Sequence, residues 1–170
     1  MNITEKGTDM NIFYLDEDPR ICAEMHCDKH CVKMILETAQ LLCTAHRVLD
    51  GDEYSDKVGL YKTAFQNHPC AVWIRECADN YLYAYYLLVN LCEQYELRYK
   101  KTHACEKLLP HLIRLPVNMS IDKNFTDPPQ CMPDQYKGED TIKAYKDYYL
   151  GEKMYFAQWK FTEVPSWINV

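Results

Sequence analysis

One stretch of the sequence, residues 21–48, carries a line of polar side chains that can do acid–base and nucleophilic chemistry. The members of this polar stripe are His26, His30, Lys33, Glu37, Gln40 and Thr44. They follow one another at intervals of four and three residues, which is the spacing of a single face of an α-helix. Apolar residues and cysteines flank the stripe on both sides, and burying ionisable groups is costly unless they pair or take part in chemistry. We therefore interpret the stripe as the candidate site, with a solvated Lys33–Glu37 ion pair as the alternative.

Lys33 and Glu37 lie one helical turn apart, beside His30, and together offer an amine, a carboxylate and an imidazole. An amine among apolar residues loses its proton more readily and becomes a nucleophile, while a nearby carboxylate can stabilise a cation or carry a proton. An amine and an acid are the groups needed to attack a sugar C1′ and expel a base through an imine. The stripe therefore predicts N-glycosidic cleavage, with Glu37 as acid–base and Lys33 as nucleophile or electrostatic stabiliser. His26, His30 and His68 would carry protons or orient the reacting groups.

A second set of residues is suited to hold a nucleic acid or a nucleotide. Asn67 and His68 precede Pro69 at the expected start of a helix, where an anion such as a phosphate is favoured. Trp73 can stack a base that has left a duplex. Residues 98–114 are locally basic although the chain has a net charge of −6, and such a patch serves anionic substrates or is simply solvated. The predicted substrate-binding residues are Gln40, Asn67, Trp73, Arg98, Lys101 and His103.

Two other classes of function stay open. His26 and His30 are one turn apart and can bind one metal ion, which would make the protein a metal-dependent hydrolase. Candidates for a third ligand are Glu37, His46, His68 and His103. The preferred mechanism needs neither a metal nor another cofactor. The third hypothesis is a non-enzymatic accessory protein that binds a host factor, in which the stripe is packed shut. The oligomeric state is left open.

The sequence pattern around these residues predicts a mainly α fold, in which three long helices position them. They are expected at about 21–48, 69–100 and 141–160. Asp18, Asn67 or His68, and Asp140 are the expected helix caps. A bend or a continuation of the second helix is expected through residues 101–109, with Pro110 ending that piece.

The connections complete the expected architecture. Residues 10–16 predict a short strand or extended segment, the acidic residues 49–57 a loop, and the proline-rich stretch 115–138 an ordered loop packed over the helices. We expect residues 1–10 to be a loose leader and residues 11–170 a single helical domain. Nine cysteines without a CxxC pair or a signal peptide indicate reduced thiols, and no apolar run reaches the roughly 18–20 residues that span a membrane.

The chain resembles small proteins widely encoded by tailed phages. The shared motifs are YLD-DP, HCDKH-VKMILE-AQLL, NHP-AVW, RY-K-H, MPD-Y and EK-W-VP-W, over most of residues 11–167. This resemblance implies a phage-encoded protein in the cytoplasm of an infected bacterial host. More distantly, the layout is similar to that of the pyrimidine-dimer DNA glycosylases of phages and bacteria. The matching positions are Met10 to Leu15, Glu37 or Glu24, His68–Pro69 and Arg98–Tyr99.

The glycosylase resemblance implies a compact, mainly helical enzyme that acts on DNA and carries a catalytic glutamate in its first helix. In that family the nucleophile is the amine of the mature N-terminal residue. Here the comparable segment lies behind nine residues unless translation starts at Met10. Even then Asn11 is too large for efficient removal of the preceding methionine. Lys33 would therefore have to supply the amine, or Glu37 would activate water.

Overall fold

The computed structural model describes residues 10–169, and within this part of the chain every regular element is a helix. The prediction of a mainly α fold is therefore confirmed. The α-helices are α2 (Pro19–Met25), α3 (Asp28–Asp50), α4 (Glu53–Val58), α5 (Pro69–Ile74), α6 (Ala78–Tyr99), α7 (Leu109–Leu112) and α8 (Thr141–Glu152). Three 3₁₀ helices join them: η1 (Ala104–Leu108), η2 (Asp134–Tyr136) and η3 (Ser166–Asn169).

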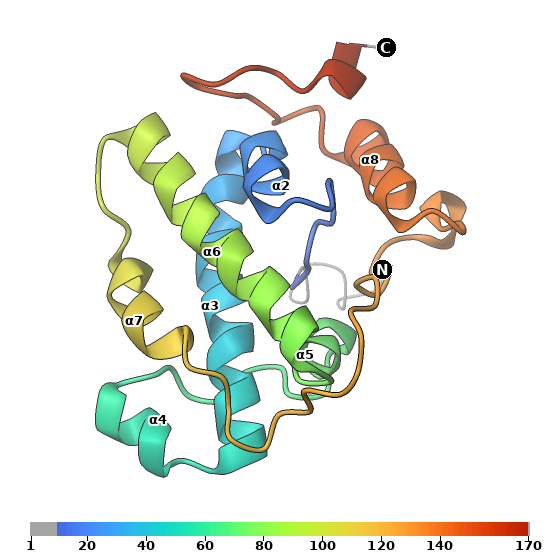
Figure 1. Ribbon diagram of the computed structural model, residues 1–170. Helices are drawn as coiled ribbons and strands as arrows, with labels where there is room; N and C mark the ends of the chain where they lie inside the picture. Colours follow the sequence, from blue (N-terminus) through green and yellow to red (C-terminus); the bar gives the residue numbers. More distant parts are fainter. Residues whose placement is uncertain (1–9, 170) are drawn as a thin grey trace, which may run out of the picture.

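The two longest helices, α3 and α6, pack along each other in the middle of the molecule (Figure 1). Ile35 and Leu42 on α3 and Leu88 and Leu91 on α6 are fully buried and belong to one core. Shorter helices surround this pair: α2 packs on α6, and α5 packs on α3. Burial of one apolar side of each helix is what stabilises this arrangement.

The helix predicted at 21–48 is two helices, because the chain turns at His26 and Cys27. His26 ends α2 and Cys27 precedes α3, and both have extended backbone angles. The turn is held from a distant part of the chain, since the Arg98 guanidinium donates hydrogen bonds to the backbone oxygens of Glu24 and His26. The polar stripe therefore begins at His30, and His26 does not belong to the same helix.

The other two predicted helices are also shorter than expected. The 69–100 helix is divided into α5 and α6 by a bend at residues 75–77. The Asn80 amide donates to the Trp73 backbone oxygen at 3.0 Å, and Ala78 N donates to Ser120 O at 2.8 Å, which fixes the bend. The third helix, α8, ends at Glu152 rather than near residue 160. Residues 153–161 follow it without helical structure.

The predicted caps at three helix starts are confirmed. Asp18 accepts from Arg20 N, His68 accepts from Cys70 N, and Asp140 accepts from Lys143 N. These bonds satisfy backbone donors that have no partner inside the helix. Pro110 was expected to end a helix, but it lies in the first turn of α7, where a residue without an N–H costs nothing. The acidic residues 49–57 were expected as a loop, yet they include most of α4.

The segment from Met10 to Leu15 is extended and buried, but it pairs with no strand in the described part of the chain. It passes between the α2–α3 region and α8 (Figure 1). Met10 was assigned to the leader and is in fact packed in the core, whereas the rest of the predicted leader lies outside the described residues. The proline-rich stretch 115–138 is irregular apart from η2, as predicted. No helix among residues 10–169 is long and apolar enough to cross a membrane.

Candidate active site

The amine and the carboxylate of the polar stripe meet on α3 as predicted. Lys33 Nζ lies 3.9 Å from Glu37 Oε1, one helical turn away. The side chains are 38% and 16% exposed, so the pair is partly shielded from water. Coulomb interactions are stronger in such a setting than on an open surface. The arrangement keeps a positive and a negative group close together where a substrate can still reach Lys33.

A small, partly open cavity of about 40 Å³ lies beside Lys33. Its walls come from the N-terminal segment, α3, the proline-rich loop and α8, and the lining residues are Met10, Asn11, Phe13, His30, Lys33, Met34, Cys131, Tyr148 and Lys153. Its volume exceeds the roughly 10–15 Å³ that one water molecule needs, and polar groups line it. The space is suited to water and is too small for a nucleobase.

An open groove of about 560 Å³ adjoins the same lysine. It is lined by Asp28, Lys29, Val32, Lys33, Tyr99, Phe156, Gln158 and Lys160. Lys29 Nζ lies 4.7 Å from the centre of the Phe156 ring, and Lys160 Nζ lies 5.4 Å from the centre of the Tyr99 ring. Lysines interleaved with aromatic rings are the usual surface for single-stranded nucleic acid, because they bind phosphates and stack bases. Lys33 lines both the groove and the cavity.

The sequence prediction missed this groove, although the signal is present in residues 153–161. The segment reads KMYFAQWKF, with lysines and aromatic residues interleaved. We expected this segment to continue the third helix. Because α8 ends early, Phe156 and Lys160 instead meet Lys29 and Tyr99 from distant parts of the chain.

His30 and His26 are buried and uncharged. Burial lowers the pKa of His30 well below its usual range, helped by nearby His26, Lys153, Lys33 and Lys29. Burial likewise lowers the pKa of His26 to about 4, and its Nδ1–H donates to the Cys22 backbone oxygen at 2.7 Å. Neither imidazole is in the doubly protonated, charged form at neutral pH. His30 lines the cavity, whereas His26 lines neither the cavity nor the groove.

His68, the third predicted proton carrier, lies away from the Lys33–Glu37 pair as the cap of α5. Its Nδ1 accepts from Cys70 N at 3.1 Å, and burial lowers its pKa. The metal hypothesis paired His26 with His30. Of their ring nitrogens, His26 Nδ1 donates to the Cys22 backbone oxygen, whereas His26 Nε2 and His30 Nδ1 are buried and have no hydrogen-bond partner in the described part of the chain. Within residues 10–169, the metal-ligating atoms that do gather belong to His68, Cys70 and Cys131.

None of the six predicted substrate-binding residues lines the cavity or the groove. Trp73 is buried, and its indole N–H donates to Thr126 of the proline-rich loop, so its ring is not available to stack a base. His103 caps η1 through Cys105 N. Asn67 and Lys101 are exposed away from both spaces, and Gln40 is half-buried further along α3.

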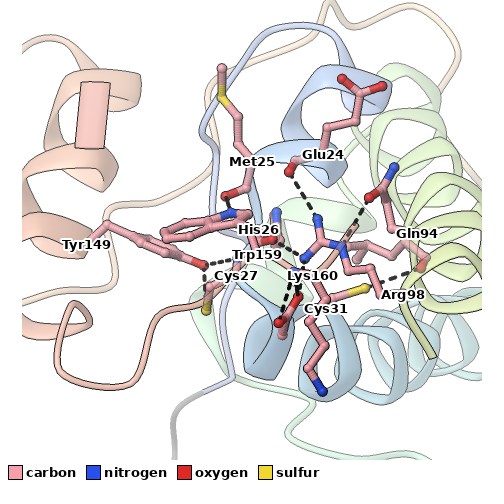
Figure 2. A network of polar contacts seen from close by, with 12 residues as sticks. Glu24, Met25, His26, Cys27, Cys31, Gln94, Arg98, Tyr149, Trp159 and Lys160 are labelled. Carbon is pink, nitrogen blue, oxygen red and sulfur yellow. Dashed lines mark hydrogen bonds and ion pairs between the residues drawn. The ribbon is translucent and has the colours of Figure 1, made fainter. Parts of the chain in front are cut away.

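Arg98 is the residue whose role differs most from the prediction, because it is buried in a network (Figure 2). Its guanidinium donates to the backbone oxygens of Glu24 and His26, at 3.0 and 2.6 Å, and to the Gln94 amide oxygen at 3.1 Å. It also forms an ion pair with Asp28 at 3.2 Å. Asp28 accepts in addition from the backbone N–H of Lys160. Arg98 thereby joins the start of α3 to α6 and to the wall of the groove.

The helical fold holds a partly shielded amine–carboxylate pair next to a water-sized cavity and a basic, aromatic groove. These features suit a protein that acts on nucleic-acid bases. Residues 10–107 match the family described as pyrimidine dimer DNA glycosylase, and since this is more than half of the chain, the protein belongs to that family. No curated protein and no solved structure matches the chain. The match confirms the glycosylase resemblance, while the phage resemblance stays a prediction.

The matched region ends before several residues that complete the site. It contains the N-terminal segment and helices α2 to α6, with the Lys33–Glu37 pair. Cys131, Tyr148 and Lys153 of the cavity, and Phe156 and Lys160 of the groove, lie beyond it. This chain therefore builds one wall of both spaces from its own C-terminal part.

Proposed function

We propose that this protein is a DNA glycosylase that removes a damaged pyrimidine by amine attack on the sugar. The observation that carries the proposal is the place of Lys33, which lines both the groove and the cavity while its amine lies 3.9 Å from the Glu37 carboxylate. Membership of the glycosylase family supports DNA as the substrate. The motif resemblance to tailed-phage proteins supports the cytoplasm of an infected bacterium as the setting.

The groove offers binding groups for one stretch of a DNA strand. Lys29 and Lys160 are placed to neutralise phosphates, which would make binding depend on salt. Tyr99 and Phe156 offer ring faces for a base taken out of the helix, once Lys160 and Lys29 turn from these rings to the phosphates. The local charge of the groove matters more here than the net charge of −6, because a cleft concentrates the field of its own residues.

The chemistry assigned to the pair follows from its two groups. Glu37 accepts a proton from the Lys33 ammonium, and the freed amine attacks C1′. The bond to the base breaks with its electron pair leaving on the base, which takes up the proton from Glu37. Loss of a proton from the nitrogen and opening of the sugar ring give an imine between Lys33 and the sugar. Glu37 stabilises the positive charge that develops at the sugar and exchanges protons during these steps. Water from the cavity then hydrolyses the imine.

His30 has a positioning role in this scheme rather than that of an acid. Its low pKa keeps it neutral, and its ring packs 4.5 Å from the Phe13 ring and 5.0 Å from the Tyr149 ring, measured between centroids. It closes one side of the cavity next to Lys33. Proton transfer is left to Glu37 and water.

Borohydride trapping tests the proposal, because reduction fixes an imine as a covalent adduct. The purified protein is incubated with DNA that carries abasic sites or ultraviolet lesions and is then reduced. We expect an adduct with the unaltered protein and with Lys143→Ala, and none with Lys33→Ala. Lys143 is the matched control, since it also pairs with an acidic residue one turn away but is exposed on α8. Glu37→Gln should slow base release by about 10² or more.

Two outcomes would refute the assignment in different ways. An adduct that survives in Lys33→Ala and disappears when the N-terminus is blocked would move the nucleophile to the chain terminus. The absence of both adduct and base release would exclude the imine mechanism altogether. DNA binding that depends on Lys29 and Lys160 without base release would make the protein a binding protein.

A further inference from the structure

Three side chains with metal-ligating atoms meet where the proline-rich loop crosses the start of α5. The ligating atoms of His68, Cys70 and Cys131 all lie within 4.8 Å of one another. His68 and Cys70 flank the first residue of α5, and Cys131 comes from the loop sixty-one residues later. Cys70 is buried, and the other two are half-buried, so a small ion can reach them but a large reagent has little room.

The distance between the two sulfur atoms fits a shared metal ion. Cys70 Sγ and Cys131 Sγ are 3.8 Å apart. Two thiolates bound to one tetrahedral zinc at about 2.3 Å lie about 3.8 Å from each other. A disulfide needs a separation of about 2.05 Å, so the thiols are nearly twice as far apart as a covalent bond would hold them. The two sulfurs can therefore bind a metal without moving, but they cannot form a disulfide without moving.

Hydrogen bonds around the cluster fix the segment that carries Cys131. The Asn11 amide N–H donates to the Cys131 backbone oxygen at 2.8 Å. Asn11 Oδ1 accepts from the Tyr145 hydroxyl at 2.8 Å and lies 3.9 Å from Cys70 Sγ. Groups of this kind, one layer outside the ligands, orient the ligands in metal sites. Of the nine cysteines, only Cys70 and Cys131 belong to such a group within residues 10–169.

We propose that His68, Cys70 and Cys131 bind one zinc-like divalent ion. Two sulfurs and one imidazole nitrogen are the donor set that zinc prefers, and the fourth position is left for water or for the amide oxygen of Asn11. His68 would exchange its present hydrogen bond with Cys70 N for the metal. Because Cys131 also lines the cavity beside Lys33, the ion would anchor the loop that forms this wall. The site does not depend on the proposed base release.

Cobalt titration of the reduced, full-length protein tests the site without any measurement of DNA repair. Cobalt bound by thiolates shows a sulfur-to-metal charge-transfer band that other ligands do not give. We expect one Co²⁺ per chain with this band, and its loss when one equivalent of Zn²⁺ is added. Cys70→Ser and Cys131→Ser should each abolish or strongly weaken the band. Cys77→Ser is the matched control, since Cys77 is buried and donates to Asn124 O, as a serine hydroxyl can.

Several results would overturn the proposal. The first is the absence of a charge-transfer band in the unaltered protein, and the second is a band that persists in Cys131→Ser. The third is a protein that binds no metal and forms a Cys70–Cys131 disulfide on exposure to air. If the serine variants do not fold, alkylation of the unaltered protein replaces them. Zinc should then protect the half-buried Cys131 thiol from iodoacetamide, and equal labelling of Cys131 with and without zinc would refute the site.

Discussion

The buried ion pair between Arg98 and Asp28 should contribute far more to stability than an exposed pair of the same length. The Arg98 side chain is 0% exposed and that of Asp28 is 9% exposed. Arg98→Met removes the charge but keeps much of the apolar volume. It leaves the Asp28 carboxylate without its ion-pair partner, and the backbone oxygens of Glu24 and His26 without their donor. Breaking one side of a buried pair typically costs about 3–5 kcal/mol.

This loss is large enough to measure directly. For a protein of this size, each 1 kcal/mol changes the melting temperature by about 2–4 °C, so Arg98→Met should melt about 6–20 °C lower. Urea unfolding followed by circular dichroism gives the free energy of unfolding. Asp28→Asn should cost less, because the amide oxygen can still accept from Arg98 and from Lys160 N.

The chain offers a matched control on the neighbouring helix. Arg20 and Glu24 form an ion pair of 3.0 Å on α2, but their side chains are 60% and 41% exposed. Arg20→Met should cost about 0–1 kcal/mol, because water and salt screen an exposed pair. Equal losses of stability in Arg98→Met and Arg20→Met would refute the conclusion that burial gives the Arg98 network its importance.

Three further predictions concern pH, salt and the proline-rich loop. Burial lowers the pKa of His46 in the folded protein to about 4. Between pH 6.5 and 4 the unfolded state therefore binds more protons than the folded state does. The free energy of unfolding should fall as the pH falls through this range. His46→Gln should reduce that fall by up to about 3 kcal/mol, and an unchanged pH profile would contradict the assignment. Lys29→Ala and Lys160→Ala should each weaken DNA binding. Each should also reduce the slope of log binding constant against log salt concentration by about the contribution of one phosphate contact. An unchanged slope would show that the DNA binds elsewhere on the protein. Trp73→Phe removes an indole N–H that donates to Thr126 of the proline-rich loop and should lower the free energy of unfolding by about 1 kcal/mol in thermal unfolding. An unchanged melting temperature would show that the hydrogen bonds between Asn80 and Thr126 hold the loop without the indole.

The sequence predicted that the Lys33 amine and the Glu37 carboxylate lie close together, because both residues belong to one uninterrupted helix. Their spacing alone brings them together, and no distant residue is needed. His26 was placed on the same face because the helical period continues through it. The turn at His26 depends on Arg98, seventy-two residues later, and a local pattern does not contain that information.

The groove and the cavity could not be predicted in the same way, since their walls come from distant parts of the chain. Lys29 and Phe156 look like a solvated charge and a core aromatic when each is considered alone. The early end of α8 brings them into contact. Trp73 and Arg98 were predicted to bind the substrate, because both residue types often bind nucleic acids. In this structure their polar groups instead donate hydrogen bonds to the protein's own backbone.

Hydrogen bonds between the two ends of the described chain also determine when, during synthesis of the protein, the cavity and the groove can form. Asn11 is held by Cys131, and Asp28 accepts from Lys160 N, a partner 132 residues later. At about 5–20 residues per second, a ribosome needs roughly 7–26 s to make the 132 intervening residues. During that time the apolar segment from Met10 to Leu15 has emerged without its final covering. A nascent chain therefore has neither the complete cavity nor the complete groove, and both form only after translation has passed residue 160.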